Sequence, residues 1–266
     1  MKKLAILGAG GRMGGALIRC AHRDEFWTLA AAVEHSSHEA IDRDAGLHAG
    51  LEEVGVPIEP SLEGAALLAD ALIDFSFHEA VPEHMDAATK QRSPIVLGTT
   101  GLTDDEAASV RLAAESIPVV WAPNMSLGVN LLFAEVKKAA SVLDAGYRME
   151  VDETHHVHKK DAPSGTALQL ARKMAEGRGV PFESLYLHDP GGKGKISDTD
   201  KLVVHSRREG EVVGDHTVVF ENEGERIEFT HHAWSRDAFA MGALHAARWA
   251  LDQPPGLYDM QDVLGL

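Results

Sequence analysis

The sequence predicts an α/β fold, with a Rossmann-like doubly wound parallel sheet followed by a second, α+β domain. Three observations support this prediction. Short apolar runs alternate with helical patterns over the first 125 residues, as in successive βαβ units. A glycine-rich turn directly follows the first apolar run. After about Leu127 the regular alternation of strand and helix patterns ends. Two later strand patterns joined by Glu-Asn-Glu-Gly indicate a hairpin.

The expected strands of the first part are short and lack strict alternation, because helices cover both faces of a parallel sheet. We expect them at Leu4–Leu7, Thr28–Val33, Ala71–Phe75, Ile95–Leu97 and Val119–Trp121. Helical patterns lie between them, at Gly14–Arg23, Val81–Gln91 and Asp104–Ser116. Thr103 and Glu106 form the pattern of a capping box. Residues 37–56 have no clear helix or strand pattern, and we expect them to form a variable loop.

The second part begins with an amphipathic helical pattern and ends with a helix that is apolar on more than one side. In order, we expect a helix at Asn130–Leu143, a strand at Tyr147–Thr154, a helix at Gly165–Arg178, a glycine-rich stretch at Pro190–Gly194, strands at Val212–Phe220 and Arg226–His231, and a helix at Ala238–Leu251. The last helix is able to return to the first domain. We therefore expect a dinucleotide-binding domain of residues 1–126 and 237–266, and a substrate-binding and oligomerisation domain of residues 127–236.

Composition limits the classes of partner. The 266 residues carry a formal net charge of -16, which repels nucleic acid and anionic membranes. Cys20 is the single cysteine and cannot form an internal disulfide, as is typical of a reducing compartment. The first apolar run stops at Gly8, too early for a signal peptide, and no later run is long enough for a membrane helix. We expect a soluble, cytoplasmic protein without nucleic-acid or membrane partners.

The turn after the first strand predicts a dinucleotide site. A strand that enters a helix through glycines directs free backbone N–H groups toward a diphosphate. The spacing Gly8-x-x-Gly11-x-x-Gly14 is a variant of the usual fingerprint, with Met13 in the sixth place. Glu34 follows Gly14 by 20 residues, where an acid accepts the adenosine ribose hydroxyls. The predicted cofactor residues here are Gly8, Ala9, Gly10, Gly11, Arg12, Met13, Glu34 and His35. The alternative is a tight turn beside an unrelated surface glutamate.

Two further segments follow later strands, at the sheet edge where ligands bind in open α/β folds. They add Gly98, Thr99, Thr100, Ala122, Pro123, Asn124 and Met125 as expected nicotinamide contacts, although either segment alone could be a simple turn. Glu34 favours NADH because a carboxylate repels a 2′-phosphate, whereas Arg12 and His35 favour NADPH. We expect NADH and NADPH to bind, NADH at least as well.

The run His155-His156-Val157-His158-Lys159-Lys160 is a dense basic cluster in an acidic protein. Ser164 is an expected N-cap, which places Gly165 and Thr166 in the first helical turn with N–H groups that bind carboxylates. The segment predicts a pocket for a small, multiply charged anion. Alternatives are a histidine metal site, to which His231 and His232 could contribute, and a solvated basic loop. Ser164 lacks the elbow of a nucleophilic serine.

Five segments together resemble the 4-hydroxy-tetrahydrodipicolinate reductase (dihydrodipicolinate reductase) family. They are Gly8–Gly14, Gly98–Thr100, Asn124–Asn130, His155–Ala167 and Val213–Val218. They occur in the family's order and span nearly the whole chain, and the basic run with Asp-Ala-Pro-Ser-Gly-Thr-Ala is the most distinctive. The resemblance implies a Rossmann-like cofactor domain, a mixed-sheet substrate domain inserted before the final helix, and a homotetramer joined through those sheets.

The resemblance also implies an activity. It is the NAD(P)H-dependent reduction of 4-hydroxy-tetrahydrodipicolinate, a small dicarboxylate of lysine and diaminopimelate biosynthesis, to tetrahydrodipicolinate. His155 is then the acid/base, and Lys159 a second proton donor and substrate contact. His156, Gly165 and Thr166 hold the substrate carboxylates. His35 stands where some members carry arginine, which disfavours strong NADPH use.

The sequence is also compatible with two other functions. One is a dehydrogenase or imine reductase that acts on a different small dicarboxylate. The other is a non-catalytic dinucleotide sensor, which the acid/base pair of His155 and Lys159 disfavours.

Overall fold

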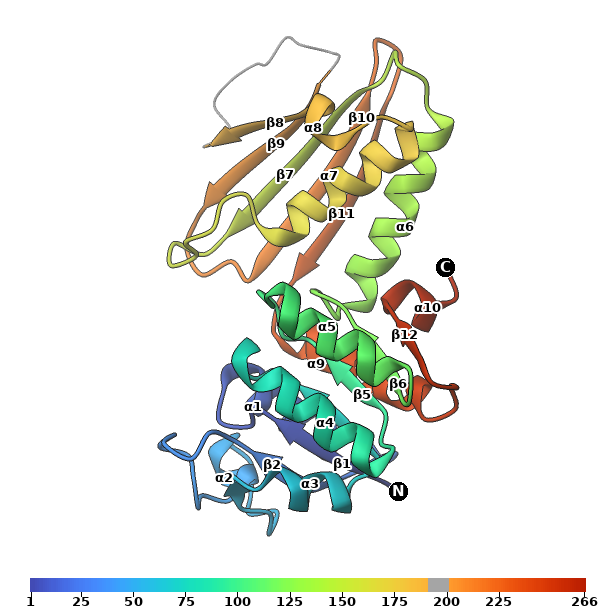
Figure 1. The fold of residues 1–266 in the computed structure, drawn as a ribbon. Coiled ribbons are helices and arrows are strands. Elements are labelled where there is room, and N and C mark those ends of the chain that lie inside the picture. The colour runs from blue at the N-terminus through green and yellow to red at the C-terminus, as the bar shows by residue number, and fades with distance from the viewer. Residues whose placement is uncertain (191–200) are drawn as a thin grey trace. The chain divides into compact units, whose positions relative to one another are not determined.

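In the computed structural model, which describes residues 1–190 and 201–266, two sheets form in separate parts of the chain (Figure 1). The chain divides into a first unit of Met1–Leu127 with Arg236–Gly265 and a second unit of Gly128–Ser235. Residues 191–194 of the predicted glycine-rich stretch lie outside the described residues. None of the described helices is long and apolar enough to cross a bilayer.

The first unit contains a seven-stranded, fully parallel sheet in the order β12-β6-β5-β4-β1-β2-β3. The strands are β1 (Lys2–Leu7), β2 (Trp27–Val33), β3 (Ile58–Glu59), β4 (Ala71–Asp74), β5 (Ile95–Leu97), β6 (Pro118–Trp121) and β12 (Gly256–Tyr258). All five strands expected in the first part of the chain are present. The two edge strands β3 and β12 were not expected, since two or three residues give no periodic signal.

Helices cover both faces of this sheet, which confirms the doubly wound fold. One core joins Leu4 and Ile6 of β1 to α1 (Arg12–Arg23), α2 (Ala45–His48), α9 (Asp237–Ala250) and α10 (Met260–Leu264). The opposite core joins Ala5 and Leu7 to α3 (Leu62–Leu68), α4 (Val81–Gln91) and α5 (Asp104–Ala114). A 3-10 turn, η1 (His78–Ala80), precedes α4. Each strand is therefore apolar at successive positions, because neighbouring residues enter different cores.

Local capping explains two of these elements. The predicted capping box of Thr103 and Glu106 is present at α5. The segment expected to be a loop is tied by Asp44, whose carboxylate accepts N–H groups of Leu47 (3.0 Å), Val54 (3.1 Å) and Gly55 (2.8 Å). The Asp44 side chain thus accepts hydrogen bonds from several loop N–H groups and caps the start of α2. Hydrophobic periodicity does not reveal this ordered conformation.

The second unit contains a mixed five-stranded sheet in the order β11-β10-β7-β9-β8. Its strands are β7 (Arg148–His155), β8 (Tyr186–Pro190), β9 (Leu202–Arg208), β10 (Gly214–Glu221) and β11 (Arg226–Ala233). β10 pairs antiparallel with β7 and β11, whereas β9 is parallel to β7 and β8. The mixed sheet implied by the family resemblance is therefore confirmed.

Helices α6 (Leu127–Val142) and α7 (Gly165–Arg178) lie over one face of this sheet, and the short α8 (Phe182–Leu185) follows α7 (Figure 1). The inward positions of β7 alternate along the strand, with Met149 and Val151 in the core below Glu153 and His155. Within the described residues, the opposite face of the sheet has no helix on it. The fold thus brings the end of β7 next to the start of α7.

Candidate functional site

The first candidate site is the turn between β1 and α1. Gly8 has a φ of +80°, a left-handed conformation that favours glycine. The N–H groups of Gly8 and Ala9 both donate to the Val33 carbonyl at 2.9 Å. Gly11 caps α1 without a side-chain hydrogen bond, and the first turn of α1 has no acidic residue. The helix therefore begins with backbone donors that nothing in its own cap neutralises.

The glycines of this turn permit close packing of backbone on backbone. A Cβ atom on Gly14 would overlap the Gly8 carbonyl, and one on Gly8 would lie 2.6 Å from the Phe75 carbonyl oxygen. The helix consequently begins directly against the strand ends. This cradle is the space that a diphosphate needs to approach the amides, and it fits a dinucleotide.

Glu34 lies beside the same turn. Its carboxylate accepts the Gly10 N–H at 3.0 Å and the His35 N–H at 2.9 Å. The segment that we expected to be a loop adds two residues that sequence reasoning missed: His48 Nε2 contacts the Gly10 carbonyl at 3.1 Å, and the His38 ring fills the space beside Gly10. His38 lies in the connection after β2 but beyond the position expected for a ribose-binding acid, and His48 lies in α2, so no positional rule indicated either.

Two pockets adjoin these groups. One of about 730 Å³ is lined by Gly8, Gly11, Glu34 and His35, together with Phe75, Ser76 and Phe77. A second of about 240 Å³ is lined by Gly98, Thr99 and Thr100, together with Phe75, Ser76, Phe77 and His78. The shared segment makes one wall for both pockets. Ala9 and Gly10 belong to the turn itself, and Arg12 and Met13 begin α1. The other expected contacts, Ala122, Pro123, Asn124 and Met125, follow β6 and line neither pocket.

The shared wall, residues 75–77, was not among the expected contacts. It follows β4, so the same edge-of-sheet rule would have selected it. A buried network holds it: Asp74 accepts the Ser76 N–H at 2.8 Å and contacts His84 Nδ1 at 2.7 Å. Thr99 Oγ1 donates to the Ser76 carbonyl at 3.2 Å. The end of β4 is thereby fixed to the end of β5.

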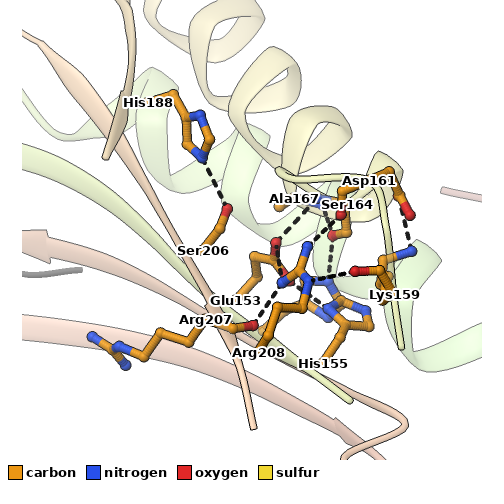
Figure 2. A network of polar contacts seen from close by, with 11 residues as sticks. Glu153, His155, Lys159, Asp161, Ser164, Ala167, His188, Ser206, Arg207 and Arg208 are labelled. Atoms are coloured by element: carbon orange, nitrogen blue, oxygen red, sulfur yellow. Dashed lines mark hydrogen bonds and ion pairs between the residues drawn. The ribbon is translucent and has the colours of Figure 1, made fainter. Parts of the chain in front are cut away.

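The second candidate site is at the end of β7. Glu153 and His155 both point inward and are only 1% and 7% exposed. The Glu153 carboxylate contacts His155 Nδ1, accepts the Ser164 N–H at 3.1 Å, and receives Arg208 Nη1 at 3.0 and 3.1 Å (Figure 2). Burial raises the pKa of Glu153, but the hydrogen bonds and charges of His155 and Arg208 outweigh it and lower that pKa to about 2.

Sequence reasoning missed Glu153 and Arg208. The alternation along β7 did contain a signal, because Glu153 is a charged residue at an inward position two residues before His155. Nothing in the sequence indicated Arg208, which reaches the site from β9.

Lys159 lies in the loop between β7 and α7. Its ammonium group pairs with Asp161 at 2.9 Å, and Arg208 donates to the main-chain carbonyls of Lys159 and Asp161 (Figure 2). The His156 N–H donates to the Val212 carbonyl at 2.7 Å, while its Nδ1 is buried without a hydrogen-bond partner in the described chain. His158 instead projects to the surface, with its side chain 75% exposed.

Ser164 caps α7, as predicted. Its Oγ accepts the Ala167 N–H and contacts His216 Nε2, both at 3.1 Å. Gly165 and Thr166 therefore occupy the first turn of α7, which has no acidic residue. Burial, with the nearby His155 charge, lowers the pKa of His216 to about 3, so this imidazole is neutral near pH 7. The first turn of α7 therefore begins beside the buried Glu153 and His155 side chains.

No set of three or more His, Cys, Asp and Glu residues is arranged to hold a metal ion within residues 1–190 and 201–266. His231 lies on β11 and His232 pairs with Asp215 at 3.1 Å.

Comparison with known proteins covers both units. Residues 2–125 match the family described as dihydrodipicolinate reductase, N-terminus, and residues 128–264 match its C-terminus. A relative from Anaeromyxobacter dehalogenans, named 4-hydroxy-tetrahydrodipicolinate reductase, is 45% identical across 100% of this chain and 98% of its own. One of the same name from Magnetococcus marinus is 44% identical across 99% and 98%. The solved structure of dipicolinate-bound dihydrodipicolinate reductase from Paenisporosarcina sp. TG-14 is 26% identical, covers 98% of both chains and has a TM-score of 0.75.

The contact between α1 and the glycine turn is testable with adjacent glycines. Gly14→Ala places a methyl group against the Gly8 carbonyl, so we expect the free energy of unfolding to fall by about 1–3 kcal/mol. NADH affinity, measured by fluorescence titration, should fall at least about tenfold. Gly15→Ala is the control, because its Cβ would lie 3.4 Å from Arg19 Nη1, an ordinary contact. Equal stability and equal NADH affinity in the two variants would contradict the role of Gly14 in the close contact between α1 and the turn.

Proposed function

The chain belongs to the dihydrodipicolinate reductase family, and on that premise we propose that it performs the NAD(P)H-dependent reduction of 4-hydroxy-tetrahydrodipicolinate with the two sites described above. The observation that supports this most directly is in the second unit. His155 and the Ser164 N–H at the start of α7 contact one buried carboxylate, that of Glu153. Arg208 connects this carboxylate to the backbone of Lys159.

The substrate carries two carboxylates. We propose that the Gly165 and Thr166 amides, together with His156, bind them, because helix amino ends favour anions. Lys159 adds a positive charge and a proton donor for the departing 4-hydroxyl. The relative that holds dipicolinate, a planar diacid, supports a dicarboxylate pocket in this fold.

His155 is the proposed acid/base. After loss of the hydroxyl, the substrate is a conjugated cyclic imine. Reduced nicotinamide, when bound, supplies hydride to C4 and thereby produces an enamine. His155 then delivers a proton to the neighbouring carbon, a task that suits an imidazole near neutral pH.

In the first unit, the residues fit a dinucleotide. The open amino end of α1 and the cradle around Gly14 suit the diphosphate, and Glu34 suits the adenosine ribose. We propose that His35 borders the ribose, that Gly98, Thr99 and Thr100 orient the nicotinamide, and that the residues 122–125 also contact it. Cofactor use by the chain follows from its family.

The substrate site is testable with two variants. His155→Gln and Lys159→Ala should each lower kcat more than about tenfold while the fold stays intact, since each removes a proton donor. Oxidation of NADH with enzymatically generated substrate measures this. Dipicolinate should inhibit competitively, and Lys159→Ala should weaken that inhibition more than His155→Gln. Near-normal turnover in both variants would place the catalytic centre elsewhere.

Glu34→Ala tests the ribose site. It should lower NADH affinity about tenfold or more, because hydrogen bonds to a charged acceptor are lost, and lower NADPH affinity less, because a repulsion is also removed. The ratio of the two Kd values is the readout. Equal losses would exclude Glu34 from this role.

We also propose a cytoplasmic homotetramer that associates through the second sheet. Its face opposite α6 and α7 has no described helix on it and carries ion pairs, such as Arg148 with Glu221 at 2.6 Å and Arg226 with Glu228 at 2.5 Å. Sedimentation velocity should show four copies. A monomer at micromolar concentration would contradict this assembly.

A further inference from the structure

We propose that Glu153 and Arg208 are a positioning pair for proton transfer, an inference that rests on the proposed function. Glu153 holds Nδ1–H of His155, so that Nε2 is the nitrogen that exchanges a proton with substrate. Arg208 holds Glu153 as a carboxylate. Both residues act through His155 and are not themselves the acid.

The position of Glu153 in the fold supports this role. Glu153 and His155 are successive inward residues of β7, so their side chains rise on the same face of the sheet. The core below them is apolar, and Glu153 is only 1% exposed. A carboxylate at such a position needs a full set of partners, because an unpaired buried charge is strongly destabilising.

The partners of Glu153 use both of its oxygens. Oε1 accepts the Ser164 N–H and Arg208 Nη1, while Oε2 contacts His155 Nδ1 and the same Arg208 nitrogen. Because an ionised carboxylate is only an acceptor, His155 must carry hydrogen on Nδ1. His155 Nε2 has no hydrogen-bond partner in the described chain, and it lies 3.0 Å from where a Cβ of Gly214 would be. Glycine at 214 therefore leaves room for the free edge of the ring.

The proton balance requires Glu153 to remain ionised. The imidazolium of His155 gives its Nε2 proton to the enamine carbon; the enamine π pair forms the C–H bond, and the N–H bonding pair stays on Nε2. The ring is then neutral with hydrogen still on Nδ1, and water returns the proton. Since the pKa of Glu153 is about 2, the carboxylate does not take the Nδ1 proton at neutral pH.

Arg208 extends the positioning to the neighbouring loop. Its Nε donates to the Lys159 carbonyl at 3.3 Å, and Nη2 donates to the Asp161 carbonyl. The Glu153–Arg208 pair thus links the imidazole, the cap of α7 through Ser164, and the backbone that bears Lys159. One ion pair orients three groups that the reaction uses.

The charges that face His155 determine the pH response. Glu153 is the anion in direct contact with the ring. From β10, His216 faces it with ring centroids 5.1 Å apart and is neutral near pH 7. From β9 and the loop, Arg208 and Lys159 are cations and disfavour the imidazolium. Removal of the Glu153 charge therefore takes away the attraction between that anion and a charged ring.

The test replaces Glu153 in the full-length protein. Glu153→Gln should lower kcat about 10²-fold. Dipicolinate affinity should change much less, because the Gln amide oxygen still accepts the Ser164 N–H at the cap of α7 while the charge beside His155 is lost. The alkaline limb of the kcat/KM profile should move to lower pH by about one unit. Glu153→Asp keeps the negative charge but moves it away from His155 Nδ1. Its kcat should therefore also fall, while the alkaline limb of its pH profile should move less than that of Glu153→Gln. Glu176→Gln is the control, since Glu176 pairs with Lys137 and Lys173 on the surface.

Nitrogen-15 NMR of labelled histidine gives a readout that does not depend on turnover. The His155 signal, assigned with His155→Gln, should show the Nδ1–H tautomer at high pH in the wild type and Nε2–H in Glu153→Gln. An Nε2–H tautomer in the wild type, or wild-type kcat and pH profile in Glu153→Gln, overturns the proposal. If Glu153→Gln does not fold, unchanged kcat in Glu153→Asp overturns it. Failure of the wild type to oxidise NADH with substrate would instead refute the proposed activity.

Discussion

An α-helix leaves its first backbone N–H groups without intrahelical partners, and both candidate sites depend on how this constraint is met. At α5 and α10 the problem is solved internally by capping boxes and acidic first turns. At α1 and α7 the first turn carries no acid, and α1 lacks even a side-chain cap. The two helices that begin at the candidate sites thus keep positive amino ends that can attract an external anion.

This local solution explains how a chain of net charge -16 can bind anionic molecules. The net negative charge repels an anion at long range, but N–H groups within hydrogen-bond distance attract it. At that distance the orientation of the donors matters more than the total charge of the protein. In the second unit the same problem arises inside the protein, since Glu153 is an anion next to the proposed carboxylate pocket. Its charge is neutralised by Arg208 and His155, so the pocket keeps its positive character.

The two sites differ in their construction. In the turn of the first unit, the backbone of α1 packs directly on the backbone of the turn. This close approach is possible because Gly14 has no side chain. In the second site, long side chains of β7 and β9 converge on each other and on the backbone N–H of Ser164, the N-cap of α7. A site made of backbone groups can be predicted from the local sequence. A site made of side chains from several strands depends on the order of those strands in the sheet.

That difference explains what the sequence alone determined. Periodicity and turn chemistry predicted the central strands, α1, α7 and the hairpin between β10 and β11, because each depends on neighbours along the chain. From the motifs we likewise predict that Gly8, Glu34 and the run from His155 to Thr166 are site residues, a prediction that the variants test. Only the tertiary structure decided that β9 lies parallel beside β7, and so that Arg208 meets Glu153 although 55 residues separate them. It also decided that His38 and His48 reach the glycine turn. Such contacts depend on sheet register and loop closure, which no local pattern encodes.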